Sequence, residues 1–363
     1  MKNYLNFEKE IKELDEELEK LKDPYNQSGI SEVDTKKISK TQEEINDRLQ
    51  SVYSNLDPWQ TTMVARHEDR PKSKFFIDNL FDDFISLSGD RYYGEDKSVI
   101  AGFAKFHNQS VLVIGQEKGE DLDSRIERNF GMMRPEGYRK TIRLMELADR
   151  FGIPIISFID TPGAYPGVGA EERGQAEAIA RSIECCMKLK VPTIAIIIGE
   201  GGSGGAIALA SSNKVLMLEN AIYSVISPEG CATILWRDPK KMLDAAKAMK
   251  LSAKDLLQLN IIDEIIEEPV GGAHRDKAFI LKNVSKVLTS SLNTFHSMSA
   301  DEIYNDRKNK FIKIGRSKGF VTNTDELSNL NVSKDQIYRI LKDKITLYSL
   351  LGFLILISLL IIL

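Results

Sequence analysis

Two glycine-rich segments contain the residue types that could do chemistry, and the second of them is the more distinctive. Residues 197–206 read IIGEGGSGGA, in which Gly199, Gly201 and Gly204 satisfy the pattern G-x-G-x-x-G directly after an apolar run. Glycine has no Cβ, so a ligand oxygen can closely approach the backbone N–H groups of such a turn. A helix that begins there adds the positive end of its dipole. The segment therefore predicts a site for a phosphate, a pyrophosphate or an oxyanion.

The residue types alone leave three interpretations of this segment open. A Walker-type phosphate loop is excluded, because Ala206 and Ile207 stand where it needs lysine and then serine or threonine. A dinucleotide site gains support from Glu219, which lies 20 residues after Gly199, the spacing of a ribose-binding acid. The helix predicted after Gly204 is short for the crossover of such a fold. An oxyanion site and a purely structural tight turn are the other two interpretations.

Other common catalytic arrangements are not predicted. Ser203 would need a histidine and an acid to act as a nucleophile, and none of the histidines stands in such a setting. The cysteines show neither the spacing of a zinc site nor a disulfide framework, so we expect no metal site in this chain. The residues concerned are His67, His107, His274, His296, Cys185, Cys186 and Cys231.

An α/β body must position the glycine segments. The apolar runs 153–160 and 191–199 predict buried strands, which alternate with predicted helices and imply a parallel sheet covered on both faces. Ligands of such sheets bind beyond the carboxyl ends of the strands, where residues 160–174 and 197–206 lie. The remaining predicted elements are a β-hairpin at 99–106 and 111–114, helices at 137–150 and 170–189, a short helix after 204, and a strand at 214–218.

The N-terminal region, residues 1–56, predicts an antiparallel helical hairpin. Apolar residues recur at helical spacing in two runs, and Pro24 ends the first of them. The net charge of −4 argues against a dedicated nucleic-acid surface, and the charged N-terminus lacks the apolar region of a secretory signal. The apolar positions are Ile11, Leu14, Leu18 and Leu21, then Ile38, Ile45, Leu49 and Val52.

The C-terminal region predicts a membrane anchor. Residues 345–363 form a run of 19 residues without a charge, which follows a polar linker at 321–344. A helix of this length spans the hydrocarbon core of a bilayer, and Lys342 and Lys344 lie where a cytoplasmic anchor carries positive charge. A hydrophobic contact with a partner and an unreliable gene end are the two alternatives.

Five blocks of the sequence closely resemble the carboxyltransferase alpha subunit of bacterial-type acetyl-CoA carboxylase. The resemblance extends from about residue 3 to residue 320. It implies a crotonase-like (ClpP/crotonase) fold of repeated ββα units over residues 57–320, preceded by the helical hairpin. The blocks are RNFGMMRPEGYRK (128–140), FIDTPGAYPGVGAEERGQAEAIA (158–180), GEGGSGGAIAL (199–209), YSVISPEGCATILW (223–236) and PVGGAHRD (269–276).

The resemblance implies transfer of a carboxyl group from carboxybiotin, on a biotin carboxyl carrier protein, to acetyl-CoA. The product, malonyl-CoA, begins fatty acid synthesis. The implied assembly is an α2β2 heterotetramer with a beta subunit that holds the zinc, and biotin carboxylase is a further partner. No cofactor would be bound covalently in this chain. The implied location is the cytoplasm. The apolar segment at 345–363 departs from the family pattern, and on its own account predicts a tether to the inner membrane.

The resemblance also implies roles for individual residues. The N–H groups of Gly204 and Gly205 would form an oxyanion hole, and the rest of the two glycine segments would line the substrate pocket. The lining residues would be Gly163, Ala164, Tyr165, Gly167, Gly201 and Gly202. Nearby charged residues have two interpretations each. Asp160, Glu171 and Glu172 are paired carboxylates or, as we favour, a loop-holding Asp and helix N-terminal acids. Three basic residues either bind coenzyme A phosphate or are solvated or paired across the subunit interface: Arg134, Arg139 and Lys140.

Overall fold

The structure is a computed structural model that describes residues 3–22, 35–315 and 348. The chain divides into two units, Met1–Ile314 and Gly315–Leu363, and the description below concerns the first. The predicted linker and the predicted anchor at 345–363 lie outside the described residues, apart from Tyr348. Among the residues that are described, no helix combines the length and the apolar character needed to cross a membrane.

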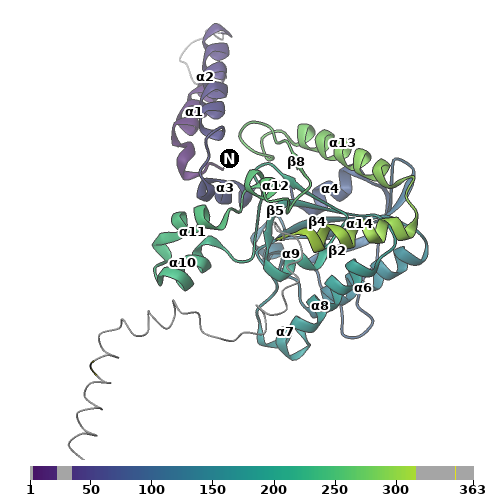
Figure 1. Ribbon diagram of the computed structural model, residues 1–363. Coiled ribbons are helices and arrows are strands. Elements are labelled where there is room, and N and C mark those ends of the chain that lie inside the picture. The colour runs from purple at the N-terminus through teal and green to yellow at the C-terminus, as the bar shows by residue number, and fades with distance from the viewer. Residues whose placement is uncertain (1–2, 23–34, 316–347, 349–363) are drawn as a thin grey trace, which may run out of the picture. The chain divides into compact units, whose positions relative to one another are not determined.

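One eight-stranded sheet forms the centre of this unit (Figure 1). Its strands follow the order β1-β2-β3-β4-β5-β6-β8, and β7 pairs with the end of β5. The pairs β1–β2 and β2–β3 are antiparallel, whereas all pairs from β3 onward are parallel. The strands are β1 Asp82–Ser86, β2 Val99–Phe106, β3 Gln109–Gln116, β4 Ile155–Thr161, β5 Thr193–Gly202, β6 Lys214–Leu218, β7 Ile222–Ser224 and β8 Glu264–Ile266.

The central strands are apolar along their length because both faces of the sheet are covered. Every residue of β4 and of β5 is buried, as expected of parallel strands between two helical layers. The predicted hairpin is confirmed: β2 and β3 are joined at His107 and Asn108, which both have positive φ. Two such residues form the tight turn that matches the twist of a hairpin.

Helices cover both faces of the sheet. α6 (Pro135–Arg150) packs on α8 (Gln175–Lys188), which packs on α9 (Ser203–Ala210). α4 (Ser73–Leu80) packs on α13 (Lys277–Phe295), and Figure 1 shows these helices across the sheet from α6 and α8. The other α-helices are α3 Pro58–Ala65, α5 Leu122–Glu127, α7 Val168–Glu172, α10 Pro228–Trp236, α11 Met242–Met249, α12 Ala253–Gln258 and α14 Ala300–Lys313.

The helix predicted at 170–189 is two helices in the structure. α7 ends at Glu172 and α8 begins at Gln175, because Gly174 between them has a φ of 82°. Such a left-handed residue interrupts the helical hydrogen-bond ladder, and glycine adopts it without a steric penalty. The break lets the chain turn after the first glycine segment and place α8 against the sheet.

The predicted N-terminal helices are present. α1 (Lys9–Lys22) and α2 (Thr35–Tyr53) pack on each other through an apolar cluster of Ile11, Leu18, Ile45 and Leu49. Glu8 joins them to the rest of the unit. Its fully buried carboxylate accepts hydrogen bonds from Tyr53 Oη at 3.0 Å and from Arg275 Nη2 at 2.6 Å.

Candidate active site

The backbone ladder between β4 and β5 is interrupted directly before the two glycine segments. Ile159 pairs with Ile197, and the next pair along the strands joins Thr161 to Gly201. Three residues of β5 therefore lie opposite one residue of β4. A bulge of this kind bends the strand and redirects its side chains, and it is common beside active sites.

Side chains satisfy the backbone groups that the bulge leaves without strand partners. Arg70 Nε donates to the carbonyl oxygen of Ile198 at 2.6 Å, and the N–H of Glu200 donates to Asp160 Oδ1 at 2.9 Å. Gly199 makes room for this second bond, since a Cβ there would lie only 2.5 Å from Asp160 Oδ1. The predicted loop-holding role of Asp160 agrees with this geometry.

A row of alternating charges extends from Asp160 across the bulge. Lys118 Nζ lies 2.7 Å from Asp160 Oδ1 and 2.8 Å from Glu200 Oε1. Arg66 Nε lies 2.7 Å from Glu200 Oε2, and its Nη1 lies 2.6 Å from Glu229 Oε1. Burial raises the pKa of Glu200, but Lys118 and Arg66 outweigh it and lower that pKa to about 2. Glu200 is therefore ionised at neutral pH.

The strand β5 continues further than the sequence predicts. We expected a turn from Gly199 onward, whereas Gly201 and Gly202 still pair with Tyr223 and Ser224 of β7. The turn residue is Ser203, which has a φ of 51° at the junction with α9. This junction resembles the turn that carries a nucleophilic serine in hydrolases. Within the described part of the chain, however, no hydrogen bond connects the Ser203 side chain to a histidine.

The two glycine segments touch backbone to backbone. A Cβ on Gly202 would lie 2.2 Å from the carbonyl oxygen of Pro162. A Cβ on Gly205 would lie 2.7 Å from the carbonyl carbon of Gly163 and 3.0 Å from the nitrogen of Ala164. Contacts below 3.0 Å require something to move, so glycine is needed at both positions for the segments to approach this closely.

The first turn of α9 presents backbone donors beside this contact. An α-helix leaves the N–H groups of its first turn without partners inside the helix, and here they belong to Ser203, Gly204 and Gly205. The N-cap residue Gly202 has no side chain that could accept from them. Gly204 is partly exposed and Gly205 is buried. The predicted oxyanion pair thus lies at a helix N-terminus, where the dipole favours negative charge.

Two buried glutamines support these segments, and neither was predicted from the sequence. Gln116, at the end of β3, donates from Nε2 to the carbonyl oxygen of Gly205 at 2.8 Å. Gln175 donates to the carbonyl oxygens of Met133 at 2.8 Å and Tyr165 at 2.9 Å. A glutamine at the end of an otherwise apolar strand was the only available signal for Gln116.

The remaining predicted pocket residues lie together on the first glycine segment. Gly163 follows Pro162 with its N–H 3.1 Å from Thr161 Oγ1. The Arg134 guanidinium lies over the Tyr165 ring, 4.7 Å from its centroid. The Tyr165 ring also covers Gly167, where a Cβ would lie 2.2 Å from Tyr165 Cε1. The structure therefore brings the residues predicted at 163–167 and at 201–205 into one region.

Comparisons with known proteins agree with this geometry. The family model described as acetyl co-enzyme A carboxylase carboxyltransferase-like matches residues 4–315. A carboxyl transferase subunit alpha from Pelagibacter ubique is 73% identical over 362 residues, which cover 99% of this chain and 98% of that protein. The chain belongs to the family of acetyl-CoA carboxylase carboxyltransferase alpha subunits. A Chelativorans subunit alpha is 53% identical over 317 residues and covers 87% of this chain and all of its own length.

Solved structures of other proteins share the fold of this carboxyltransferase alpha subunit. A transcarboxylase 12S structure superposes with a TM-score of 0.52 at 17% identity, over 64% of this chain and 44% of that chain. The beta subunit of a Pseudomonas aeruginosa geranyl-CoA carboxylase superposes with a TM-score of 0.51 at 14% identity, over 68% and 46%. The alpha subunit thus spans less than half the length of those chains. These likenesses confirm the predicted crotonase-like α/β fold.

Two of the three basic residues considered for coenzyme A phosphate form ion pairs inside the alpha subunit, whereas Arg134 donates to Asn129 Oδ1 at 3.1 Å. Arg139 Nε lies 2.7 Å from Asp90 Oδ2. Lys140, which is buried, pairs with Glu95 and donates to the carbonyl oxygen of Val99 at 2.7 Å. Arg139 and Lys140 are therefore neutralised by groups of the same chain, which argues against a phosphate-binding role and differs from the solvated or interface positions that we expected as the alternative. Within residues 3–22 and 35–315, no group of three or more His, Cys, Asp or Glu is placed to hold a metal ion.

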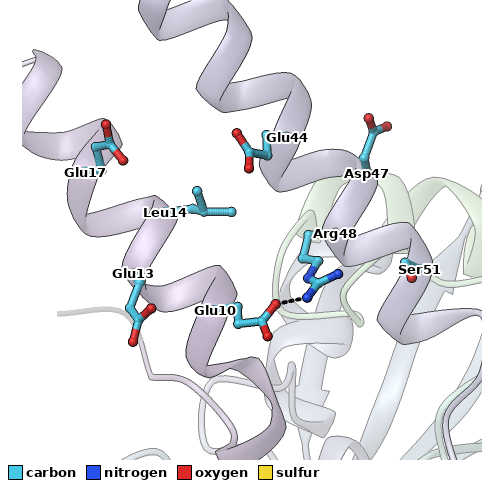
Figure 2. Close-up of a pocket in the computed structure, with 8 residues that line it drawn as sticks. All are labelled: Glu10, Glu13, Leu14, Glu17, Glu44, Asp47, Arg48 and Ser51. Atoms are coloured by element: carbon cyan, nitrogen blue, oxygen red, sulfur yellow. Dashed lines mark hydrogen bonds and ion pairs between the residues drawn. The ribbon is translucent and has the colours of Figure 1, made fainter.

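Two hollows in the alpha subunit differ in character. One, of about 410 Å³, adjoins the bulge and is lined by Lys118, Asp160, Pro162 and Glu200 among others. The other, of about 640 Å³, is the groove between α1 and α2 that Figure 2 shows. Carboxylates on exposed helix faces line most of this groove, unlike the mainly apolar sites that small ligands prefer. Its lining residues are Glu10, Glu13, Leu14, Glu17, Glu44, Asp47, Arg48 and Ser51.

Proposed function

We propose that the first turn of α9 stabilises the oxygen of carboxybiotin that gains negative charge during carboxyl transfer to acetyl-CoA. The donors are the N–H groups of Gly204 and Gly205, and Gly163, Ala164, Tyr165, Gly167, Gly201 and Gly202 line the same pocket. The observation that carries this proposal is the close backbone contact of the two glycine segments beside these donors. Donors aimed at developing charge lower a barrier by about 2.7–4 kcal/mol each.

In this proposal the alpha subunit contributes placement and charge stabilisation. Carboxybiotin, delivered on a biotin carboxyl carrier protein, supplies the carboxyl group and, once it has given it up, a base for the methyl proton of acetyl-CoA. Gly204 and Gly205 hold the charged oxygen through their N–H groups. Gln116 holds the carbonyl of Gly205 and so fixes the orientation of the first turn of α9. Correct placement of two reactants accounts for a large part of many enzymatic rate accelerations.

We further propose that the alpha subunit acts in an α2β2 heterotetramer with a zinc-containing beta subunit, and together with biotin carboxylase. Exposed apolar side chains on and before α10 support a partner surface, since large apolar side chains gather where proteins meet. Val225, Ile234 and Leu235 are 73%, 69% and 65% exposed, and Trp236 is 42% exposed.

We also propose that the protein is cytoplasmic and that residues 345–363 tether it to the inner membrane. The alignment with the Pelagibacter ubique protein covers 99% of this chain, so it includes most of the apolar segment. That shared sequence argues against an unreliable gene end. Relatives such as the Chelativorans protein match over 87% of the chain, which agrees with a catalytic body that is complete without the tether.

Reconstitution tests the proposed function. The purified chain would be assayed for malonyl-CoA formation from acetyl-CoA and carboxylated carrier protein, alone and mixed with a beta subunit. We expect turnover in the mixture and none with either chain alone. A correctly assembled mixture that forms no malonyl-CoA would contradict the proposal.

A further inference from the structure

The bulge creates a structural problem for the two glycine segments. Backbone pairing normally fixes the separation of two strands. Between β4 and β5 this pairing is interrupted from the Ile159–Ile197 pair to the Thr161–Gly201 pair. The segments that follow must nevertheless meet within the close contact of Gly205 and Gly163. Something other than the strand ladder must therefore hold β4 and β5 together at this point.

Lys118 is placed to hold β4 and β5 together at the bulge. Its side chain is 16% exposed, and its ammonium lies 2.7 Å from Asp160 on β4 and 2.8 Å from Glu200 on β5. It thus bridges the two strands at the residues that the ladder leaves out. Lys118 comes from a third segment, the loop after β3, so the bridge also ties that loop to the site.

The backbone that carries Lys118 is itself held firmly. The buried Glu117 carboxylate accepts hydrogen bonds from the N–H of Gly119 at 2.9 Å and from the N–H of Lys74 at 2.7 Å. The N–H of Glu117 donates to the carbonyl oxygen of Ser98 at 2.8 Å. A rigid base lets the ammonium act as a fixed point for both carboxylates.

We propose that Lys118 is a positioning residue for carboxyl transfer, which sets the separation of the two glycine segments by joining Asp160 to Glu200. This inference rests on the proposed role of the first turn of α9. Without the ammonium, Arg66 would still neutralise Glu200, but the buried Asp160 carboxylate would face Glu200 with no cation between them. The repulsion would push β4 and β5 apart just before Thr161 and Gly201. The glycine segments would lose their register although the rest of the sheet stays paired.

The test compares Lys118→Met with Lys118→Arg, which keeps the charge. Lys97→Met is the matched control, because Lys97 pairs with Glu127 on the surface and is 56% exposed. Each variant is assayed in the complex with the beta subunit for kcat and for KM toward acetyl-CoA. Hydrogen–deuterium exchange of the purified chain is followed at residues 160–169 and 199–205, with α13 as an internal reference.

We expect Lys118→Met to lower kcat about 10- to 100-fold, as a small misplacement of reacting groups can. KM for acetyl-CoA should stay within about twofold, and exchange should rise at the two glycine segments while α13 is unchanged. Lys118→Arg should recover part of the lost kcat, and Lys97→Met should match the unaltered protein. Exchange that rises equally everywhere, or kcat within twofold of the unaltered protein, would overturn the proposal.

Two further measurements distinguish failure of this proposal from a variant that does not fold and from failure of the proposed function. If Lys118→Met does not fold, Glu200→Gln removes one end of the bridge and should raise exchange at the same two segments only; no rise there would overturn the proposal. If the unaltered complex forms no malonyl-CoA, the proposed function fails, yet the exchange pattern still decides whether Lys118 sets the separation of the segments.

Discussion

Gly205 and Gly163 touch through their backbones, whereas the neighbouring Gly204 has room beside it. A Cβ on Gly205 would lie 2.7 Å from the carbonyl carbon of Gly163. A Cβ on Gly204 would lie 3.4 Å from Ile179 Cγ2, which is an ordinary contact. Two adjacent glycines of one motif therefore face different constraints: Gly205 must be glycine for steric reasons, and Gly204 need not be.

This difference predicts opposite effects of two matched substitutions. Gly205→Ala should destabilise the protein by about 1–3 kcal/mol, because the added methyl group forces the glycine segments apart, and it should lower turnover at least about tenfold. Gly204→Ala should leave the free energy of unfolding unchanged or raise it by about 0.5–1 kcal/mol, since alanine favours the helix. Denaturant unfolding and a turnover assay measure both. Equal destabilisation by the two variants would contradict the steric explanation.

A buried ion pair below the bulge predicts a large loss of stability. Arg70 is 3% exposed and pairs with the fully buried carboxylate of Glu268. Glu268→Gln keeps the shape of the side chain but leaves the Arg70 charge unpaired, so we expect a loss of about 3–5 kcal/mol. Glu127→Gln removes the exposed partner of Lys97 and should cost at most about 1 kcal/mol. Similar losses in the two variants would show that Arg70 finds another partner.

The stacked rings of His67 and His274 predict a dependence of stability on pH. Their centroids are 3.8 Å apart, and neither His274 nitrogen has a hydrogen-bond partner among the described residues. Burial lowers the pKa of His274 to about 2, helped by the charges of His67, Arg275, Arg70 and Lys277. The folded protein therefore keeps His274 neutral at pH values where the unfolded chain takes up a proton.

Stability should consequently be complete above about pH 6.5 and fall as the pH decreases, because only the unfolded state binds this proton. Each pH unit below 6.5 costs up to about 1.4 kcal/mol. His274→Phe retains a ring for stacking and removes the titration. Its free energy of unfolding should change less between pH 7 and pH 5 than that of the unaltered protein. Parallel pH profiles for the two proteins would refute this assignment.

Much of the fold could be predicted because its signals are local. The runs 99–106 and 214–218 coincide with β2 and β6, since β-rich apolar stretches bounded by turns report directly on strands. The strand β1 was missed, and so were β7 and β8, two strands of three residues each that are too short to show a pattern. The strands β7 and β8 form by pairing with the edges of β5 and β6, and that pairing exists only in the assembled sheet.

The candidate site could be predicted only in part, because only some of its residues have a local sequence signal. The glycine segments can be recognised from their local sequence. The side chains that hold them in place come from distant positions in the chain. Lys118 and Glu200 are 82 positions apart, and Arg66 and Glu200 are 134 apart. Lysine, arginine and glutamine are common surface residues, so nothing in their types marks Lys118, Arg66 or Gln116 as parts of a site. The bulge beside which these side chains act can be recognised only when the register of β4 and β5 is known.

The apolar segment at 345–363 predicts a difference between the full chain and a shortened one. A chain that stops at Phe320 should stay in the supernatant of a high-speed spin without detergent and should form malonyl-CoA with the beta subunit at the full rate. The full chain should sediment with membranes and be released by detergent. The tether is disproved if both chains remain in the supernatant.

The most direct test of the central claim removes one N–H group and nothing else. Replacing the peptide bond between Gly204 and Gly205 by an ester deletes the proposed donor of Gly205 and adds no atom to the close contact with Gly163. We predict an assembled complex whose kcat for malonyl-CoA formation falls about 10²- to 10³-fold, the effect of losing one donor of an oxyanion hole. An ester variant that turns over at the rate of the unaltered protein would show that the first turn of α9 does not stabilise the reacting oxygen.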